Sequence, residues 1–209
     1  MAKCYTGGQA TRNIMTLSGQ GQVAASPNLA IIHLGVETTG FDLTTIQAEN
    51  ARIIEAVTQT LRAMGISDIK TVQYSIDKNY IFENGRQIDR GYTIRHILEI
   101  RSNQIDDVGR IVDTAVMMGA NRVEFIAFDL SDRGSYYRQA LNLALEDAQK
   151  KAISISRSLR IQVDLIPIRI VENSALPIQP LLFQREAAGT QILPGTLLIE
   201  ASMTAEFSY

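Results

Sequence analysis

The apolar residues of this chain recur at every second position in some stretches and at every third or fourth in others. This switching constrains the fold more than any other feature. Apolar and polar residues alternate from Leu197 to Ser208 and again from Leu29 to Thr39. Strict alternation is typical of a strand with one covered face, so these stretches predict antiparallel sheets that pack on helices.

Three other segments carry the helical spacing. Their apolar residues recur at intervals of three and four, which predicts helices over about 43–64, 104–118 and 133–159. Shorter alternating runs predict further strands at about 13–24, 71–76, 91–101, 122–130 and 165–171. Strands and helices mixed in this order predict an α+β fold.

The order of the predicted elements suggests an internal duplication. Two β-α-β-β units, at about 28–102 and 120–209, are linked by the short helix at 104–118. Their long helices end at Met64 and Leu159, and the strands that follow keep the same offset. A chance repetition stays open as the alternative, because this element order is common in α+β proteins.

A turn signal joins two of the predicted strands. Asn84-Gly85 favours a tight hairpin turn. A two-residue turn would set Tyr74 against Arg95, whereas a three-residue loop sets Tyr74 against Ile94. Because the second register keeps apolar faces together, we predict the three-residue loop.

Charge and composition exclude several classes of protein. The 20 basic and 22 acidic residues give a net charge of -2, which argues against a nucleic-acid binder, since such proteins need an excess of Lys and Arg. No apolar run approaches the roughly 20 residues of a membrane-spanning helix. With one Cys there is no internal disulfide, and with two His a zinc site of Cys and His ligands is nearly excluded.

Few residues carry recognisable chemistry. His33 and His96 lie on predicted strands, where a hydrogen-bonded core or interface role is expected, because no carboxylates at metal-ligand spacing accompany them. Gly19 and Gly21 precede neither a Lys-Ser/Thr pair nor a helix, so a bent edge strand is predicted instead of a phosphate loop. We therefore predict no catalytic, cofactor-binding or metal-binding residues and no enzyme activity.

Two apolar segments stand outside the predicted core. One is the far end of the predicted hairpin, and the other is a loop at 173–194, which is long for a compact domain. The predicted contact residues are Tyr80, Ile81 and Phe82 in the hairpin and Leu181, Leu182 and Phe183 in the loop. We expect these side chains to contact a neighbouring subunit. For the loop, the alternative is that it covers the core of its own domain.

Several short motifs occur at intervals along the chain. They are Leu-Ser-Gly-Gln-Gly-Gln-Val at 17–23, Pro-Asn-Leu-Ala at 27–30, Leu-Gly-Val-Glu-Thr at 34–38, Gln-Ala-Glu-Asn-Ala at 47–51, Gly-Ala-Asn at 119–121 and Pro-Gly at 194–195. Asp-Ala at 147–148 and Lys-Ala at 151–152 lie within the long predicted helix. Together these motifs resemble the bacterial SIMPL-domain family. The resemblance covers about residues 13–209, and residues 1–12 are expected to form a flexible N-terminal arm.

The resemblance implies a cellular location more than a biochemical activity. Members of the family are mostly of unknown biochemical function and are often carried in the cell envelope. One periplasmic immunogenic branch assembles into a large channel-like homo-oligomer, and the family is associated with stress tolerance. No catalytic residues are established in the family, so the resemblance implies none here.

We therefore predict a non-enzymatic, self-assembling protein whose main partner is a copy of itself, with another protein partner left open. The alternative is a module that binds a peptide or a small ligand in a cleft between the two β-α-β-β units. The N-terminal residues lack the apolar core of a signal peptide. This predicts a cytoplasmic location, or an envelope location if a leader was removed. Cys4 is expected to be an incidental exposed thiol.

Overall fold

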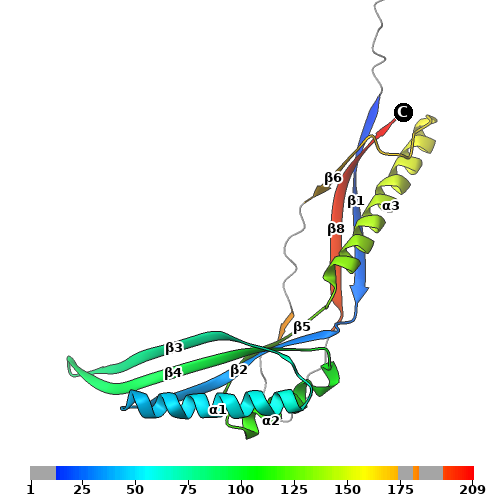
Figure 1. Ribbon diagram of the computed structural model, residues 1–209. Helices are drawn as coiled ribbons and strands as arrows, with labels where there is room; N and C mark the ends of the chain where they lie inside the picture. The colour runs from blue at the N-terminus through cyan, green and yellow to red at the C-terminus, as the bar shows by residue number, and fades with distance from the viewer. Residues whose placement is uncertain (1–12, 174–180, 184–194) are drawn as a thin grey trace, which may run out of the picture. The chain divides into compact units, whose positions relative to one another are not determined.

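The computed structural model describes residues 13–173, 181–183 and 195–209. These residues form two compact units, each with its own antiparallel sheet and its own helices (Figure 1). The α1–α2 unit comprises residues 26–131, 181–183 and 195–197, and the α3 unit comprises residues 13–25, 132–173 and 198–209. The predicted α+β class, with antiparallel sheets packed on helices, is confirmed.

The α1–α2 unit contains a five-stranded sheet in the order β3-β4-β2-β5-β7. Its elements are β2 (Leu29–Gly40), α1 (Leu43–Ala63), β3 (Asp68–Glu83), β4 (Arg86–Ser102), the 3-10 turn η1 (Ile105–Asp107), α2 (Val108–Met117), β5 (Arg122–Asp129) and β7 (Leu181–Phe183). All pairings in this sheet are antiparallel. Both helices lie on the same face of the sheet (Figure 1).

The core of the α1–α2 unit forms where the even-numbered side chains of three strands meet the two helices. Its fully buried members are Ala30, Ile32, Leu34 and Val36 of β2, Ile100 of β4, Phe128 of β5, Val57 and Leu61 of α1, and Ile111 and Ala115 of α2. Helix α1 begins where the Asp42 carboxylate accepts hydrogen bonds from the backbone N–H groups of Thr44 and Thr45. It ends before Gly65, whose φ of 86° follows the helix in the left-handed region.

The α3 unit contains a three-stranded sheet in the order β1-β8-β6. Its elements are β1 (Ile14–Ala25), α3 (Arg133–Leu159), β6 (Arg169–Asn173) and β8 (Leu197–Ser208), whose first residue is grouped with the other unit. The predicted alternation of β8 is confirmed, because Ile199, Ala205 and Phe207 are fully buried and Glu200 is exposed. Phe207 and Ala205 pack against the alanines of α3.

Glycines in β1 allow α3 to approach the sheet closely. A Cβ added to Gly19 would lie 1.9 Å from the carbonyl oxygen of Ala144, and one added to Gly21 would lie 2.0 Å from that of Ala140. β1 is an edge strand, as predicted. Its two glycines are explained by this contact with the helix, not by a bend.

The boundary between the units differs from the expected one. The strand predicted at 122–130 was expected to open the second unit, at 120–209, but the observed strand β5 pairs with β2 along most of its length. The chain passes from one compact unit to the other at Ser131 and Asp132. The short helix that was expected to link the two units packs instead beside α1, within the α1–α2 unit.

The predicted register of the β3–β4 hairpin is wrong. Asn84 and Gly85 form a two-residue turn with positive φ angles of 50° and 75°, and Glu83 pairs with Arg86. A bulge between Lys78 and Tyr80 then shifts the pairing by one residue, so that Tyr74 lies opposite His96 instead of Ile94, and a second bulge follows between Thr71 and Gln73. The apolar faces still coincide, because the observed register at Tyr74 differs from the predicted one by two residues.

Candidate functional site

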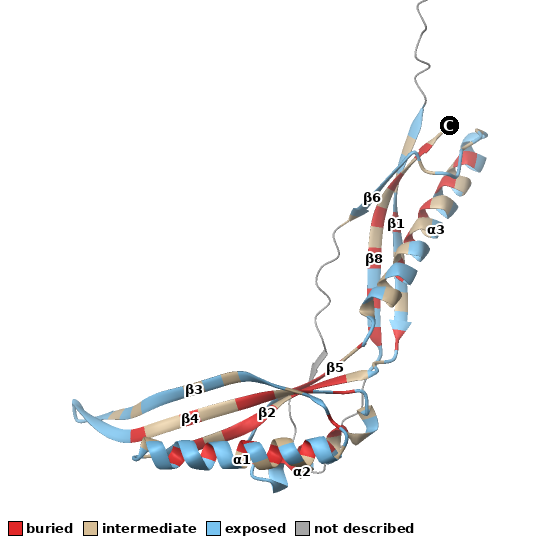
Figure 2. Cartoon of the chain, in the orientation of Figure 1, coloured by how far each residue is buried: buried red, intermediate tan, exposed pale blue. Residues whose placement is uncertain are grey.

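The end of the β3–β4 hairpin extends beyond the rest of its sheet. β2 pairs with β4 only as far as Gly40 and Tyr92, whereas β3 and β4 pair with each other up to the turn. The residues from Lys78 to Tyr92 therefore form a two-stranded ribbon, which Figure 2 shows as largely exposed. This ribbon is called the hairpin end below.

The hairpin end presents large apolar side chains to solvent. Phe82 is 72% exposed and Tyr80 is 50% exposed, and Ile88 is also exposed. The register places Tyr80 and Phe82 on one face of the ribbon and Ile81, which pairs with Ile88, on the other. The three residues predicted as one contact thus occupy two faces, of which the Tyr80–Phe82 face is the more aromatic.

Charges of both signs accompany these apolar groups. Lys78 Nζ lies 3.0 Å from Asp89 Oδ2, and Arg90 lies 3.8 Å from Glu83. The backbone N–H of Gly91 donates to Asp89 Oδ1 at 2.8 Å, and this bond together with Lys78 lowers the pKa of the Asp89 carboxyl. Asp89 thus stays ionised, and the hairpin end offers anionic and cationic groups side by side.

The sheet face opposite the helices carries a cluster of charges around Glu99. The Glu99 carboxylate lies 2.9 Å from Lys70 Nζ, 3.0 Å from His33 Nε2 and 2.8 Å from Arg101 Nε. Burial by itself raises the pKa of Glu99, but the hydrogen bonds from Lys70, His33 and Arg101 outweigh it and lower the pKa to about 2. Glu99 is therefore ionised near neutral pH, and its carboxylate is engaged by these three side chains.

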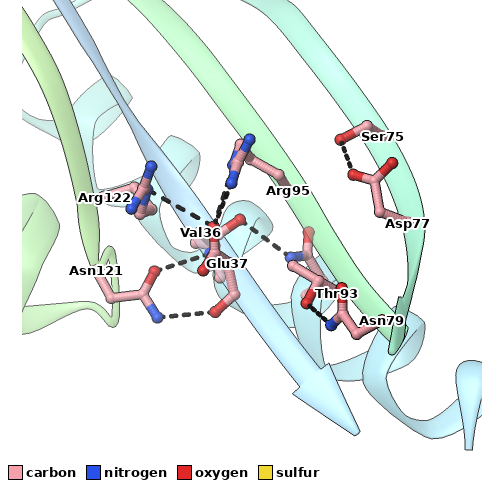
Figure 3. Close-up of polar contacts among 10 residues, drawn as sticks. Val36, Glu37, Ser75, Asp77, Asn79, Thr93, Arg95, Asn121 and Arg122 are labelled. Carbon is pink, nitrogen blue, oxygen red and sulfur yellow. Dashed lines mark hydrogen bonds and ion pairs between the residues drawn. The ribbon is translucent and has the colours of Figure 1, made fainter. Parts of the chain in front are cut away.

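A second cluster surrounds Glu37 on β2 (Figure 3). Arg95 donates two hydrogen bonds to Glu37 Oε2, at 2.9 and 3.0 Å, and Arg122 lies 3.7 Å from the same oxygen. The side chain of Asn121 bonds both the backbone N–H and the backbone carbonyl of Glu37 at 2.8 Å. Asn121 belongs to the Gly-Ala-Asn motif, so that motif fastens the start of β5 to β2.

His33 and His96, which the sequence placed on strands, lie on opposite faces of the five-stranded sheet. His33 stacks on Phe125 with ring centroids 4.1 Å apart and contacts Glu99, while His96 contacts Tyr74 edge-on and lies 2.9 Å from Thr71 Oγ1. Within the described residues, no group of three or more His, Cys, Asp or Glu side chains is placed to hold a metal ion. Cys4 lies outside the described residues.

The predicted contact at Leu181, Leu182 and Phe183 lies on the chain's own sheet. These residues form β7, which pairs with Phe128, Ala127 and Ile126 of β5. The backbone of this segment is thus occupied within the molecule, where it covers the β5 edge of the sheet. Contact of the three side chains with another copy stays a prediction.

Sequence reasoning found the exposed hairpin end and missed the two charge clusters. The signal for the clusters was available, because Glu37, Arg95 and Glu99 occupy the polar positions of the alternating runs. What it could not supply was the pairing of β2, β3, β4 and β5 that brings these charges together. Among the described helices, none has the length and apolarity needed to cross a bilayer.

Known proteins resemble the chain at low identity. YggE of Escherichia coli K12, an uncharacterized protein, is 22% identical over 137 residues, which are 65% of this chain and 56% of YggE. The 26 kDa periplasmic immunogenic protein of Brucella melitensis is 24% identical over 174 residues, which are 80% of this chain and 68% of that protein. The matched segment thus spans little more than half of YggE.

The family comparison covers nearly the whole chain. The model of the SIMPL family, described as a protein of unknown function (DUF541), matches residues 15–207. This range includes both compact units and all the described strands and helices except the first residue of β1 and the last of β8. The chain therefore belongs to the SIMPL family.

Proposed function

We propose that this protein acts as a homo-oligomer and that its subunits contact one another through the Tyr80–Phe82 face of the hairpin end. The observation that carries the proposal is the exposure of two aromatic side chains on a ribbon that no other described strand flanks beyond Tyr92. Full burial of a side chain such as Phe82 stabilises by about 1.5 to 3 kcal/mol. A contact that covers both rings would recover that free energy.

The shape of the hairpin end supports the same proposal. An isolated two-stranded ribbon is only marginally stable in water. Here the ribbon extends from Lys78 to Tyr92 with an ion pair between Lys78 and Asp89 and a contact of Lys78 with the Tyr92 ring, 5.6 Å from its centroid. Packing against another protein surface would give the ribbon the covered face that the described part of its own chain does not supply.

A second copy is the partner that the charges favour. The hairpin end carries Lys78, Arg86 and Arg90 together with Glu83 and Asp89. In a two-fold symmetric contact, each patch meets its own copy, so a patch must complement itself. A patch with both signs of charge around an aromatic centre meets that condition, whereas a single-sign patch would repel its copy.

Sedimentation velocity across micromolar concentrations tests the proposal. We expect an oligomer for the unmodified chain and an association about tenfold weaker or more for Phe82→Ser, since 1.4 kcal/mol corresponds to tenfold. Met117→Ser is a matched control, because Met117 is also 72% exposed but lies at the end of α2. Circular dichroism of both variants checks that the fold is retained.

Two results would contradict the proposal. One is a monomer at every concentration for the unmodified chain. The other is an equal loss of association in Phe82→Ser and Met117→Ser, which would mean that exposed apolar groups associate without a specific surface. The loop residues Leu181, Leu182 and Phe183 form a separate prediction, in which their joint replacement weakens assembly further.

We also propose that the protein works in the cell envelope. The support is the name of the Brucella relative, which describes that protein as periplasmic. Osmotic-shock fractionation of cells that express the natural gene tests this location, with a cytoplasmic enzyme as the control. Recovery of the protein with the cytoplasmic enzyme would contradict it. A role in stress tolerance, implied by the family resemblance, stays a prediction.

A further inference from the structure

A cavity of about 260 Å³, open to solvent on one side, lies between α1 and the strands β3 and β4 of the α1–α2 unit. Its wall includes Asn50, Ile54 and Glu55 of α1, Tyr74 of β3 and His96 of β4. An apolar cavity of about 150 Å³ is enough to bind benzene, so this one has room for a substituted ring. It lies apart from the hairpin end, because none of its lining residues falls between Lys78 and Tyr92.

Asn50 lines the cavity and carries a buried acceptor. Its side chain is buried, with 1% exposure, four residues from Ile46 and four from Ile54 on the covered stripe of α1. Nδ2 donates to the Val36 carbonyl at 3.3 Å, and Thr38 Oγ1 also lies 3.3 Å from it. A carbonyl can only accept, so this contact fixes which end of the amide is oxygen.

The Asn50 oxygen is left without a partner. Oδ1 is buried and has no hydrogen-bond partner among the residues that the structure describes. Buried polar atoms are nearly always hydrogen-bonded, and one that is not calls for an explanation. A molecule in the cavity that carries an N–H group would supply the missing donor.

The rest of the wall sets the charge and the shape of such a molecule. Tyr74 and His96 meet edge-on with ring centroids 5.2 Å apart. Burial lowers the pKa of His96, so the imidazole is neutral near neutral pH. Among the described residues that line the cavity, Glu55 is then the one that carries a charge. Aromatic walls with a single carboxylate favour a planar cation over an anion.

We infer that this cavity binds a small planar ring compound that carries N–H donors and a positive charge, such as an aromatic amidine or an aromatic amine. The N–H group bonds Asn50 Oδ1, the ring packs against Tyr74, and Glu55 discriminates by charge. This inference does not rest on the proposed assembly. A chain that remains a monomer would still bind the compound.

Three probes of nearly the same shape test the inference with the unmodified chain. Benzamidine is a planar cation with N–H donors, benzamide is neutral with N–H donors, and benzoate is an anion without them. Titration followed by NMR should give a dissociation constant of about 1 mM for benzamidine, as expected for so small a ligand. Benzamide should bind a few-fold more weakly, and benzoate at least about tenfold more weakly. The shifts should centre on the Asn50 side-chain amide and on His96.

Three variants localise the binding. Ala51 lines the cavity and is exposed, so Ala51→Leu should occupy part of the space and abolish binding of benzamidine. Glu55→Gln should weaken benzamidine about fivefold, within the range expected for an exposed ion pair, and leave benzamide unchanged. Glu49→Gln is the matched control, because Glu49 is exposed on the same helix and does not line the cavity.

Four outcomes would overturn the inference. They are the absence of shifts at Asn50 and His96 up to about 10 mM benzamidine, shifts centred on another surface, benzoate binding as tightly as benzamidine, and unchanged binding in a folded Ala51→Leu variant. The first of these would mean that the cavity holds water only. If Ala51→Leu fails to fold, the exposed Glu55→Gln variant still separates the three probes.

Discussion

The two units of this protein cover their sheets with helices of opposite character. Helix α1 buries large aliphatic side chains, among them Ile54, Val57 and Leu61. Helix α3 buries a stripe made only of small side chains, namely Ala140, Ala144, Ala148, Ala152 and Ser156. In the contact between α1 and its sheet, large side chains fill the space between the two backbones. In the contact between α3 and its sheet, small side chains let the two backbones lie close together.

This difference teaches that one layered architecture can rest on two kinds of packing. Each large side chain in the α1 contact contributes about 1.5 to 3 kcal/mol of hydrophobic free energy when fully buried. An alanine buries much less area, so the α3 contact depends on close approach of many atoms, which Gly19 and Gly21 of β1 permit. The two contacts should therefore respond oppositely to a change in side-chain size.

The largest expected effect comes from emptying the α1 contact. Leu61→Ala should lower the free energy of unfolding of the α1–α2 unit by about 2 to 5 kcal/mol, because Leu61 is fully buried and its removal leaves a cavity. Urea unfolding, with hydrogen exchange resolved by peptide, measures the loss and shows which unit carries it. Leu43→Ala, at a half-buried position of the same helix, should cost roughly 1 kcal/mol. If Leu61→Ala increased the exchange rate more in α3 than in α1, the comparison would be wrong.

The next effect comes from adding atoms to the α3 contact. Gly19→Ala should lower the free energy of unfolding of the α3 unit by about 1 to 3 kcal/mol, since the new Cβ would collide with the Ala144 carbonyl. Hydrogen exchange in α3 should speed up while exchange in α1 stays unchanged. Gly134→Ala is the control within α3, where the nearest atom is 3.3 Å away on the flexible Arg138 side chain. That control should be neutral or stabilising by up to about 1 kcal/mol. A neutral Gly19→Ala would contradict the close-packing account.

The smallest effect compares an acidic residue on each sheet, Glu99 in the α1–α2 unit and Glu206 in the α3 unit, by how much its ion pairs stabilise the protein. Because the folded pKa of Glu99 is lowered from 4.5 to about 2, its ion pairs stabilise the α1–α2 unit above the ordinary pKa. This stabilisation is lost as the pH falls from about 4.5 toward 2. With Lys70 and Arg101 partly exposed, the expected size is about 1 to 2 kcal/mol.

Acid titration of stability measures this effect. Glu99→Gln should remove that part of the pH dependence and should destabilise the protein near neutral pH. Glu206→Gln, which removes a pair with the exposed Arg169 in the α3 unit, should change stability by less than about 0.5 kcal/mol. Equal effects of the two variants would show that the charge cluster on the five-stranded sheet has no special role.

Local spacing predicted most of the elements. The helix predicted at 133–159 is α3 with the same bounds, and the strand predicted at 29–39 is β2 without its last residue. These segments carry strong periodic patterns and recognisable caps, such as Asp132, whose carboxylate accepts from the Ser135 N–H. The apolar spacing does not by itself select the buried stripe of α3. Its apolar pattern includes Leu159, which is exposed, because the stripe that packs is the one with the smallest side chains.

The hairpin shows where local reasoning ends. The predicted loop assumed unbroken pairing, but Val72 is an extra residue in β3, and Arg90 with Gly91 lies opposite Asn79 alone. Gly91 has a φ of 81°, and a Cβ there would lie 2.3 Å from the Gly40 carbonyl oxygen. A contact with β2 thus favours a bulge that the two paired strands do not reveal by themselves.

The candidate sites divide in the same way. The exposed aromatic residues of the hairpin end could be predicted, because Tyr80 and Phe82 immediately precede the Asn84-Gly85 turn signal and lie far from any helical stripe. Asn50 could not be singled out, although its position between Ile46 and Ile54 fits the buried spacing of α1. A buried asparagine matters only through what its two polar atoms face, and those partners come from β2.

The sequence by itself determined the family, the α+β class, and which face of each long helix and strand is apolar, because these depend on residue order and on spacing within one element. Tertiary structure decided that β5 joins β2, that α3 packs through alanine against glycine, and that Asn50 of α1, whose oxygen is buried, lines a cavity. Each of these depends on which distant segments meet. The free energy that selects such partners comes from whole surfaces, which no local pattern records.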